Sequence, residues 1–184
     1  TAGVAFTVSP AVVVKVAVTG STSGVFGDTF TVYLSGFAAS EAVIIVPTSL
    51  FTVNTAITVA ATGSSNGAST RVMASISGGS KTITVIGATS GAQATTTLTV
   101  NPTIAVVNPS GLTQISVPAS APSTFYLKGY GFQASTAIAS SSTTVAGMST
   151  IHSGVSTTAA GAFGASPLAV TSTSNLPIGE ATIV

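Results

Sequence analysis

The stretch of sequence that decides the fold occurs twice. Residues 29–42 read TFTVYLSGFAASEA, and residues 124–137 read TFYLKGYGFQASTA. The two stretches align without a gap and share Thr-Phe at the start, Gly-Phe and Ala-Ser in the middle, and Ala at the end. Each begins with a strand-like run and continues into a glycine turn. A repeat of this kind predicts two copies of one structural unit in the chain.

Outside the repeat, short runs alternate apolar residues with Thr or Ser, and period two is typical of half-buried strands. Turn-rich tracts separate the runs, and no segment keeps a helical period for three turns. We therefore expect an all-β chain of two tandem Ig-like β-sandwich domains. The expected strands cover residues 12–19, 29–34, 42–46, 56–60, 70–76, 81–86 and 95–100 in the first domain, and 104–107, 125–128, 137–140, 168–171 and 179–184 in the second.

The second domain is expected to lack its last strand. When residues 182–183 are aligned on residues 82–83, the turn and strand that correspond to residues 86–100 are absent from the sequence. An unfilled strand position leaves backbone N–H and C=O groups unpaired beside an apolar groove. We expect the edge of this acceptor groove at Thr182, Ile183 and Val184.

Residues 2–10 resemble a closing strand, because they match residues 94–102 in identity or in type. Val4, Phe6 and Val8 alternate with smaller or polar residues and can present one apolar face. We therefore expect an N-terminal donor strand that completes the second domain of another copy. The expected organisation is a donor strand at residues 1–10, a first domain at 11–102 and an incomplete second domain at 103–184.

Composition excludes several classes of protein. Charged residues make up 4% of the chain, against about 25% in an ordinary soluble domain. Hydrophobic residues make up 45%, which excludes a disordered chain. The longest apolar run, residues 11–18, is too short for a transmembrane helix and contains Lys15. We expect no transmembrane segment and a secreted, extracellular protein from which a signal peptide has been cleaved.

The few charges are scattered, and the formal net charge is +1. Single, separated cations do not form the basic patch that nucleic acid requires, so no nucleic-acid partner is expected. Only three side chains carry a carboxyl group that could couple folding to acid, so we expect unusual resistance to low pH. These side chains are Asp28, Glu41 and Glu180.

Motifs of catalysis and cofactor binding occur only in degenerate form. Gly129–Ala134 fits the dinucleotide pattern G-x-G-x-x-A, and Gly63–Gly67 fits G-x-S-x-G, but both patterns require a following helix that the sequence does not predict. His152 is the only histidine, and the chain has no cysteine, so no metal site is expected. The three carboxylates lie beside strand starts and turns. We therefore expect no catalytic residue, no cofactor and no enzyme activity.

Two further possibilities remain open at this point. Lys15, Lys81 or Lys128 could form an isopeptide bond with Asn101 or Asn175. The rings of Tyr33, Tyr126 and Tyr130 could form a sugar-binding platform, although we favour core or cross-strand packing for them.

The sequence also resembles a known family. Gly129-Tyr130-Gly131-Phe132 followed by Ala134-Ser135, together with residues 175–184, is similar to Ig-like modules of archaeal surface proteins. The whole architecture resembles the subunits of archaeal thread filaments and bundling pili, which join by donor-strand complementation. Unlike many such filaments, this chain has no usable N-glycosylation sequon.

The resemblance implies a structural subunit of an extracellular surface filament, a homopolymer that grows head to tail. Its further partners would be cell surfaces or neighbouring filaments. The main alternative is an adhesin or S-layer-like module that binds carbohydrate or a cell surface, and a jelly-roll capsid protein is a third.

Overall fold

The structure is a computed structural model, and it describes residues 3–52, 56–113, 116, 118, 120, 122–138 and 155–171. Strands dominate these residues, and the only helix among them is the 3-10 turn η1 (Thr48–Leu50). The described part of the protein is therefore all-β, as the alternating sequence predicts. The chain divides into two compact units, Thr1–Ala74 with Gly79–Asn101 and Ser75–Gly78 with Pro102–Val184.

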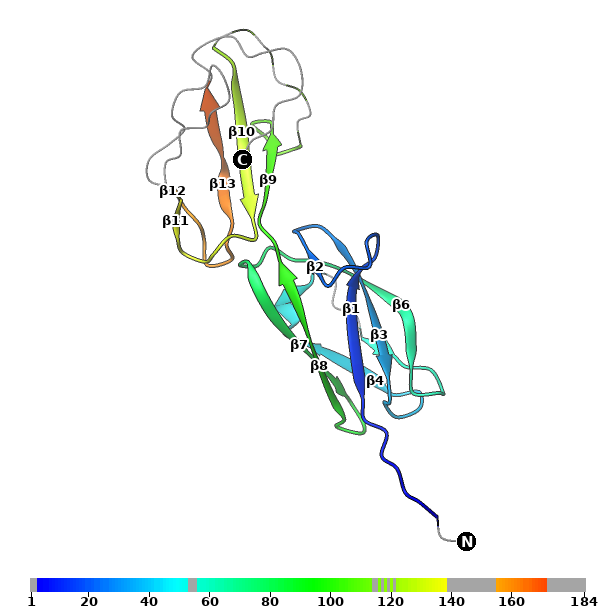
Figure 1. Ribbon diagram of the computed structural model, residues 1–184. Coiled ribbons are helices and arrows are strands. Elements are labelled where there is room, and N and C mark those ends of the chain that lie inside the picture. The colour runs from blue at the N-terminus through cyan, green and yellow to red at the C-terminus, as the bar shows by residue number, and fades with distance from the viewer. Residues whose placement is uncertain are drawn as a thin grey trace. The chain divides into compact units, whose positions relative to one another are not determined.

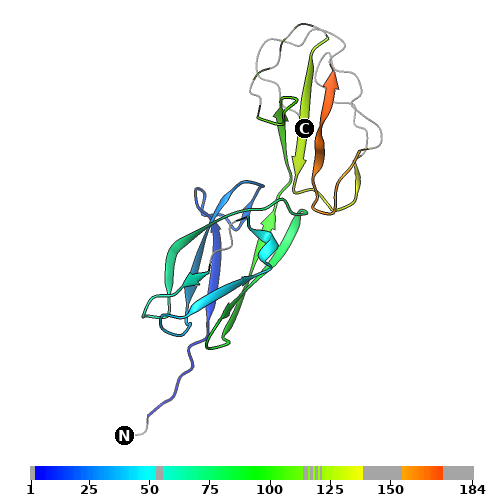
Figure 2. The same ribbon diagram turned by 180° about the vertical axis from the view of Figure 1, so that it is seen from behind.

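The first unit contains two sheets (Figures 1 and 2). One has the strand order β1-β3-β6 and consists of β1 (Ala11–Val16), β3 (Thr29–Ser35) and β6 (Ser65–Val72). The other has the order β2-β8-β7-β4-β5 and consists of β2 (Ser23–Gly24), β8 (Gln93–Val100), β7 (Gly79–Gly87), β4 (Ala42–Val46) and β5 (Ile57–Thr58). The pairing of β2 with β8 is parallel, and the other pairings are antiparallel.

Alternating burial gives each sheet of the first unit one inward face. On β1, Val12, Val14 and Val16 are buried while the residues between them are exposed. Gly24 of β2 lies against the other sheet, because a Cβ added to it would come within 2.7 Å of the Phe30 ring on β3. The two sheets therefore face each other across one apolar core. Each buried Val, Leu, Ile or Phe side chain contributes about 1.5–3 kcal/mol to such a core.

The described part of the second unit repeats five strands of the first. Its three-stranded sheet has the order β13-β10-β9 and consists of β9 (Thr103–Val107), β10 (Thr124–Tyr130) and β13 (Phe163–Thr171). The short strand β11 (Ala137–Ile138) pairs with β12 (Val155–Ser156) as β4 pairs with β5. The core of this unit contains Phe125, Leu127, Phe163 and Val170.

The repeat extends to local irregularities. The pairing of β3 with β6 shifts its register after Val32, and the pairing of β10 with β13 shifts after Leu127. A glycine with positive φ lies on the bulged strand in each case, Gly67 at 77° and Gly164 at 81°. Such bulges use glycine because other residues are strained in this conformation.

Several expected strands have different bounds in the structure. The strand expected at residues 70–76 is β6, which covers Ser65–Val72 and so begins inside residues 63–67, whose Gly, Ser and Asn content predicts a turn. The strand expected at 168–171 is β13, which begins at Phe163. Two strands are not among those expected. Strand β2 lies in residues 20–24, whose Gly, Ser and Thr content predicts a turn, and β12 lies in the Ser/Thr-rich middle of the second domain. The strand expected at residues 179–184 lies outside the described residues.

Candidate functional site

Residues 3–10 form an extended segment that precedes β1 and pairs with no strand of the described chain (Figure 1). The segment carries three large apolar side chains that are mostly exposed, Val4 at 92%, Phe6 at 86% and Val8 at 64%. Because side chains alternate along an extended backbone, these three can share one face. Soluble proteins rarely leave such a face uncovered, so the segment is a candidate binding element.

Strand β8 shows the environment that the same pattern has inside the fold. Its residues Leu98 and Val100 are buried, and Thr96 is half-buried. Both backbone edges of β8 are paired, to β7 on one side and to β2 on the other. Backbone hydrogen bonds continue beyond the ladder, from Thr99 N–H to Thr22 O and from Asn101 N–H to Gly24 O. The apolar face that is exposed in residues 3–9 is thus buried in β8.

The base of the segment is fixed where it enters the first unit. Gly36, which follows β3, has a φ of 76° and lies close to the segment, because an added Cβ would approach Ser9 O at 2.6 Å and Pro10 Cα at 3.0 Å. A side chain at position 36 would therefore displace the chain where it enters β1. The expected groove edge, Thr182, Ile183 and Val184, lies outside the described residues.

Glu41 makes a contact that sequence analysis missed. Its buried carboxylate accepts hydrogen bonds from the backbone N–H groups of Ala38 (2.7 Å), Thr89 (3.2 Å) and Ser90 (3.0 Å) and from the Ser90 hydroxyl (2.8 Å). The N–H of Ser90, foremost, and those of Ala38 and Thr89 hold the pKa of Glu41 below its ordinary value, against the raising effect of burial. Glu41 thus joins the loop before β4 to the turn between β7 and β8.

The corresponding loop of the second unit is held differently. Thr136 occupies the position of Glu41, and its hydroxyl donates to Ala134 O, within its own loop. The buried hydroxyl of Thr157 closes the loop by donating to Gln133 O (2.6 Å) and accepting from Thr136 N–H (2.9 Å). The bonds that hold this loop among the described residues come from hydroxyl and backbone groups.

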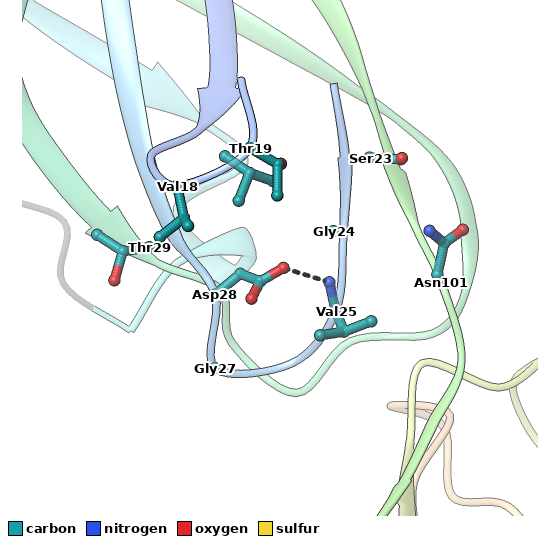
Figure 3. Close-up of a pocket in the computed structure, with 10 residues that line it drawn as sticks. Val18, Thr19, Ser23, Gly24, Val25, Gly27, Asp28, Thr29 and Asn101 are labelled. Atoms are coloured by element: carbon teal, nitrogen blue, oxygen red, sulfur yellow. Dashed lines mark hydrogen bonds between the residues drawn. The ribbon is translucent and has the colours of Figure 1, made fainter. Parts of the chain in front are cut away.

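Asp28 lines a shallow pocket in the first unit (Figure 3). Its Oδ2 accepts a hydrogen bond from Val25 N–H at 2.9 Å. Asn101 also lines this pocket, but none of the three lysines does. The pocket therefore does not bring an isopeptide partner to Asn101, and Asn175 lies outside the described residues. Asp28 and Glu41 bind the amides of different loops and do not form a carboxylate pair.

The three tyrosines are divided between the two units. Tyr33 belongs to the first unit, while Tyr126 and Tyr130 belong to the second. Tyr33 is exposed and the other two are half-buried, so the expected core positions are wrong. The alternative of cross-strand packing agrees with the register, in which Tyr126 lies opposite Val107 and Tyr130 opposite Thr103. Tyr33 pairs with Val13 across the sheet, as expected of a cross-strand neighbour.

The two degenerate motifs lie in turns and strands. Gly129 and Tyr130 end β10, and a turn follows at Gly131, which has a φ of 72°. Gly63 belongs to a turn, and β6 begins at Ser65. No helix follows either motif, so neither has the geometry that phosphate binding or a nucleophile elbow requires.

The remaining expectations concern His152, Glu180, metal binding and membrane-spanning helices. His152 and Glu180 lie outside the described residues. Within the described part of the chain, no three His, Cys, Asp or Glu side chains gather into a group that could hold a metal ion. Among the same residues, no helix is long and apolar enough to cross a membrane.

Comparison of the chain with protein-family models, curated proteins and solved structures found no match. The function must therefore be argued from the chain's own geometry.

Proposed function

We propose that this chain is a structural subunit of an extracellular surface filament. Each subunit comprises two tandem Ig-like β-sandwiches, and residues 3–9 of one copy complete the second sandwich of the next. The observation that carries this proposal is the exposure of Val4, Phe6 and Val8, whose counterparts in β8 lie in or beside a core.

The energetics of such a joint are favourable. Burying one Phe and two Val side chains provides about 5–9 kcal/mol, before the gain from the backbone ladder and the cost of ordering the segment. The donor surface and the acceptor surface are different parts of the chain. A heterologous contact of this kind extends into an open filament when its rotation does not close a ring.

The described strands of the second unit show which positions of the first unit are repeated there. They are counterparts of β1, β3, β6, β4 and β5. The proposal assigns the β7 position to residues 179–184, with Thr182, Ile183 and Val184 at the groove edge, and the β8 position to the incoming segment.

The difference between Glu41 and Thr136 points in the same direction. Glu41 binds the turn at Thr89 and Ser90, which connects β7 to β8 within one chain. If another copy supplies the β8 position of the second unit, no such turn joins the two strands there. A carboxylate at position 136 would then lack the partners that Thr89 and Ser90 supply to Glu41, and Thr is the residue found.

The proposal is tested by removing the apolar face of the segment. A variant with Val4→Ser, Phe6→Ser and Val8→Ser is expected to remain monomeric in sedimentation and to form no filaments in electron micrographs, while the parent polymerises. The matched control, Ala5→Ser with Thr7→Ser, changes the opposite face and should polymerise like the parent. Filaments of the triple variant at parental concentration would refute the proposal.

A second arm supplies the donor in cis. A copy of residues 2–10, appended after Val184 through a short Gly linker, should occupy the chain's own acceptor and suppress polymerisation. If the parent forms no filaments at any concentration, the alternative of an adhesin or S-layer-like module is favoured instead.

A further inference from the structure

The outward face of the β1-β3-β6 sheet carries a row of three exposed side chains. Strand β3 lies between β1 and β6 (Figure 1). Tyr33 on β3 lies opposite Val13 of β1 on one side and opposite Asn66 of β6 on the other. Val13 and Tyr33 are each 41% exposed, and Asn66 is exposed. Because directly opposed side chains of an antiparallel pair lie on the same face, the three residues form one row on the outside of the sheet.

The Tyr33 ring is held against β6 by a glycine. A Cβ added to Gly67 would come within 2.7 Å of Tyr33 Cε1 and 2.9 Å of Tyr33 Cζ. The ring therefore occupies the space above Gly67, the residue with positive φ at the register shift of this strand pair. A large part of Tyr33 stays exposed in this position, so the ring is both fixed and accessible.

The second unit shows that the fold does not require an aromatic ring here. In the alignment of residues 29–42 with 124–137, Lys128 takes the place of Tyr33. A Cβ added to Gly164, the bulge glycine of that unit, would lie 3.3 Å from Lys128 Cγ. An aliphatic stem thus covers the glycine in the second unit as the Tyr33 ring does in the first. The ring in the first unit needs an explanation beyond covering Gly67.

The charge on this sheet is of one sign. Lys15 is exposed and lies opposite Thr31, two residues along β3 from Tyr33. A long side chain at such a diagonal position reaches its neighbour on the same face. The sequences of β1, β3 and β6 contain two cations, Lys15 and Arg71, and no Asp or Glu. An anionic group beside the ring would therefore meet an attractive potential.

We propose that this face of the first unit binds an acidic polysaccharide, one whose sugar rings carry carboxylates. The C–H bonds on one side of a pyranose ring carry partial positive charge, and they pack on the negative face of an aromatic ring such as Tyr33. The Asn66 amide both donates and accepts hydrogen bonds, as sugar hydroxyls require. The Lys15 ammonium pairs with a sugar carboxylate, and Val13 extends the apolar surface beside the ring.

This inference goes beyond the filament function and does not depend on it. All four residues belong to the first unit and lie outside residues 3–9. The site is complete in a single copy of the chain. In a polymer the same face would recur in every subunit, so weak single sites would add up to tight binding along a long polysaccharide.

Equilibrium dialysis of labelled oligosaccharides against the full chain tests the proposal, because it measures binding whether or not the chain polymerises. The probes are oligogalacturonate, a malto-oligosaccharide of the same length as the neutral sugar, and polyglutamate as a carboxylate polymer without sugar rings. The variants are Tyr33→Leu, which still covers Gly67, Tyr33→Phe, which keeps the ring, and Lys15→Gln. The matched control is Ile44→Ala, at a side chain that is 50% exposed on the outward face of the other sheet.

The parent should bind oligogalacturonate more tightly than the malto-oligosaccharide or polyglutamate. Tyr33→Leu should weaken the binding of both sugars by about two- to tenfold, while Tyr33→Phe and Ile44→Ala bind like the parent. Lys15→Gln should weaken the binding of oligogalacturonate alone, by about two- to fivefold.

Three results would overturn the proposal. The first is a parent that does not prefer oligogalacturonate to the neutral sugar. The second is polyglutamate binding as tight as that of oligogalacturonate, which would indicate attraction by charge alone. The third is unchanged sugar binding by Tyr33→Leu. If Tyr33→Leu lowers the Tm, Lys15→Gln decides instead, because Lys15 is exposed and its replacement leaves the core intact; equal binding of oligogalacturonate by Lys15→Gln and the parent then refutes the site.

Discussion

One pair of facing core positions is filled differently in the two units. In each unit one residue of the pair is large and the other is small, but the large residue lies on a different strand. In the first unit, buried Leu34 lies opposite buried Ser65, and in the second, Gly129 lies opposite buried Phe163. A Cβ added to Gly129 would overlap the Phe163 ring. A large residue on the central strand thus accompanies a small one on its neighbour, and the reverse also holds. The fold fixes the volume available at this pair and leaves open which strand fills it.

The largest effect should come from breaking this pair in the second unit. Phe163→Ser alone should destabilise the unit by about 3–5 kcal/mol because it empties part of the core, and Gly129→Leu alone should cost about 1–3 kcal/mol or more through overpacking. The double variant recreates the pair of the first unit. Its loss of stability, measured by denaturant unfolding, should be smaller than the sum of the two by about 0.5–3 kcal/mol.

The reciprocal change in the first unit, Leu34→Gly with Ser65→Phe, is the matched control. The loss of stability of this double variant should also be smaller than the sum of the losses of its two single variants. Additive losses in both units would contradict the view that these positions share one volume.

A second comparison concerns the turn glycines that follow β5 and β12. Gly63 and Gly161 have φ values of 70° and 65°. An added Cβ would overlap Phe37 O in the first case and Phe132 O in the second. Each of Gly63→Ala and Gly161→Ala should therefore cost about 2–4 kcal/mol, from left-handed strain and displacement of the opposite carbonyl. Calorimetry should show equal losses in the two units, and Gly91→Ala, where the added Cβ meets nothing within 4 Å, should lose less.

Because of Glu41, we expect the stability of the first unit to depend on pH in the acid range. Its pKa is lowered in the folded state from an ordinary value of 4.5, so the folded unit binds fewer protons than the unfolded chain. The stabilisation by Glu41 is therefore complete above about pH 4.5 and declines as the pH falls through the lowered folded pKa. Calorimetry from pH 7 to pH 2 should show a decline of the first unit's Tm in the acid range. Glu41→Gln should lower this Tm at pH 7 and flatten its pH dependence.

The matched variant in the second unit, Thr136→Ala, should leave the pH dependence of either transition unchanged. An equal acid response of the parent and Glu41→Gln would contradict the assignment. The general acid resistance expected from the scarcity of carboxylates stays a prediction, and Glu41 is the point where we expect it to be weakest.

The sequence was informative wherever a local pattern determines structure. Alternation located β1, β3, β4, β7 and β8 to within two or three residues at each end, because period two directly reflects which face of a strand is buried. It failed at the start of β6, where Asn66 and Gly67 have the composition of a turn, but Asn66 pairs with Tyr33 and Gly67 lies in the register shift that follows. It also missed β2, whose two residues are strand only because β8 lies beside them.

Some features of the candidate site could be predicted from the sequence and others could not. The exposed face of Val4, Phe6 and Val8 could be identified from alternation and from the internal match. The bonds of Glu41 to Thr89 and Ser90 could not, because they join residues 48 and 49 positions apart. Only the contact with Ala38, three residues away, has a local signal, that of an acid near the end of a glycine turn.

The smallest expected effect concerns the loops that contain Ser40 and Ser135. It tests whether the two loops have the same backbone conformation as well as a similar sequence. Ser40 and Ser135 both have positive φ values, 57° and 50°, a conformation that disfavours residues with a Cβ. Ser40→Gly and Ser135→Gly should each stabilise their own unit by about 0.5–1 kcal/mol, because relief of this strain exceeds the entropic cost of glycine. The measurement is the Tm of each transition, with Ser21→Gly, outside these loops, as the control. A gain in one unit without a gain in the other would show that the loops differ in conformation, and the residue-by-residue correspondence of the two units would then fail at this turn.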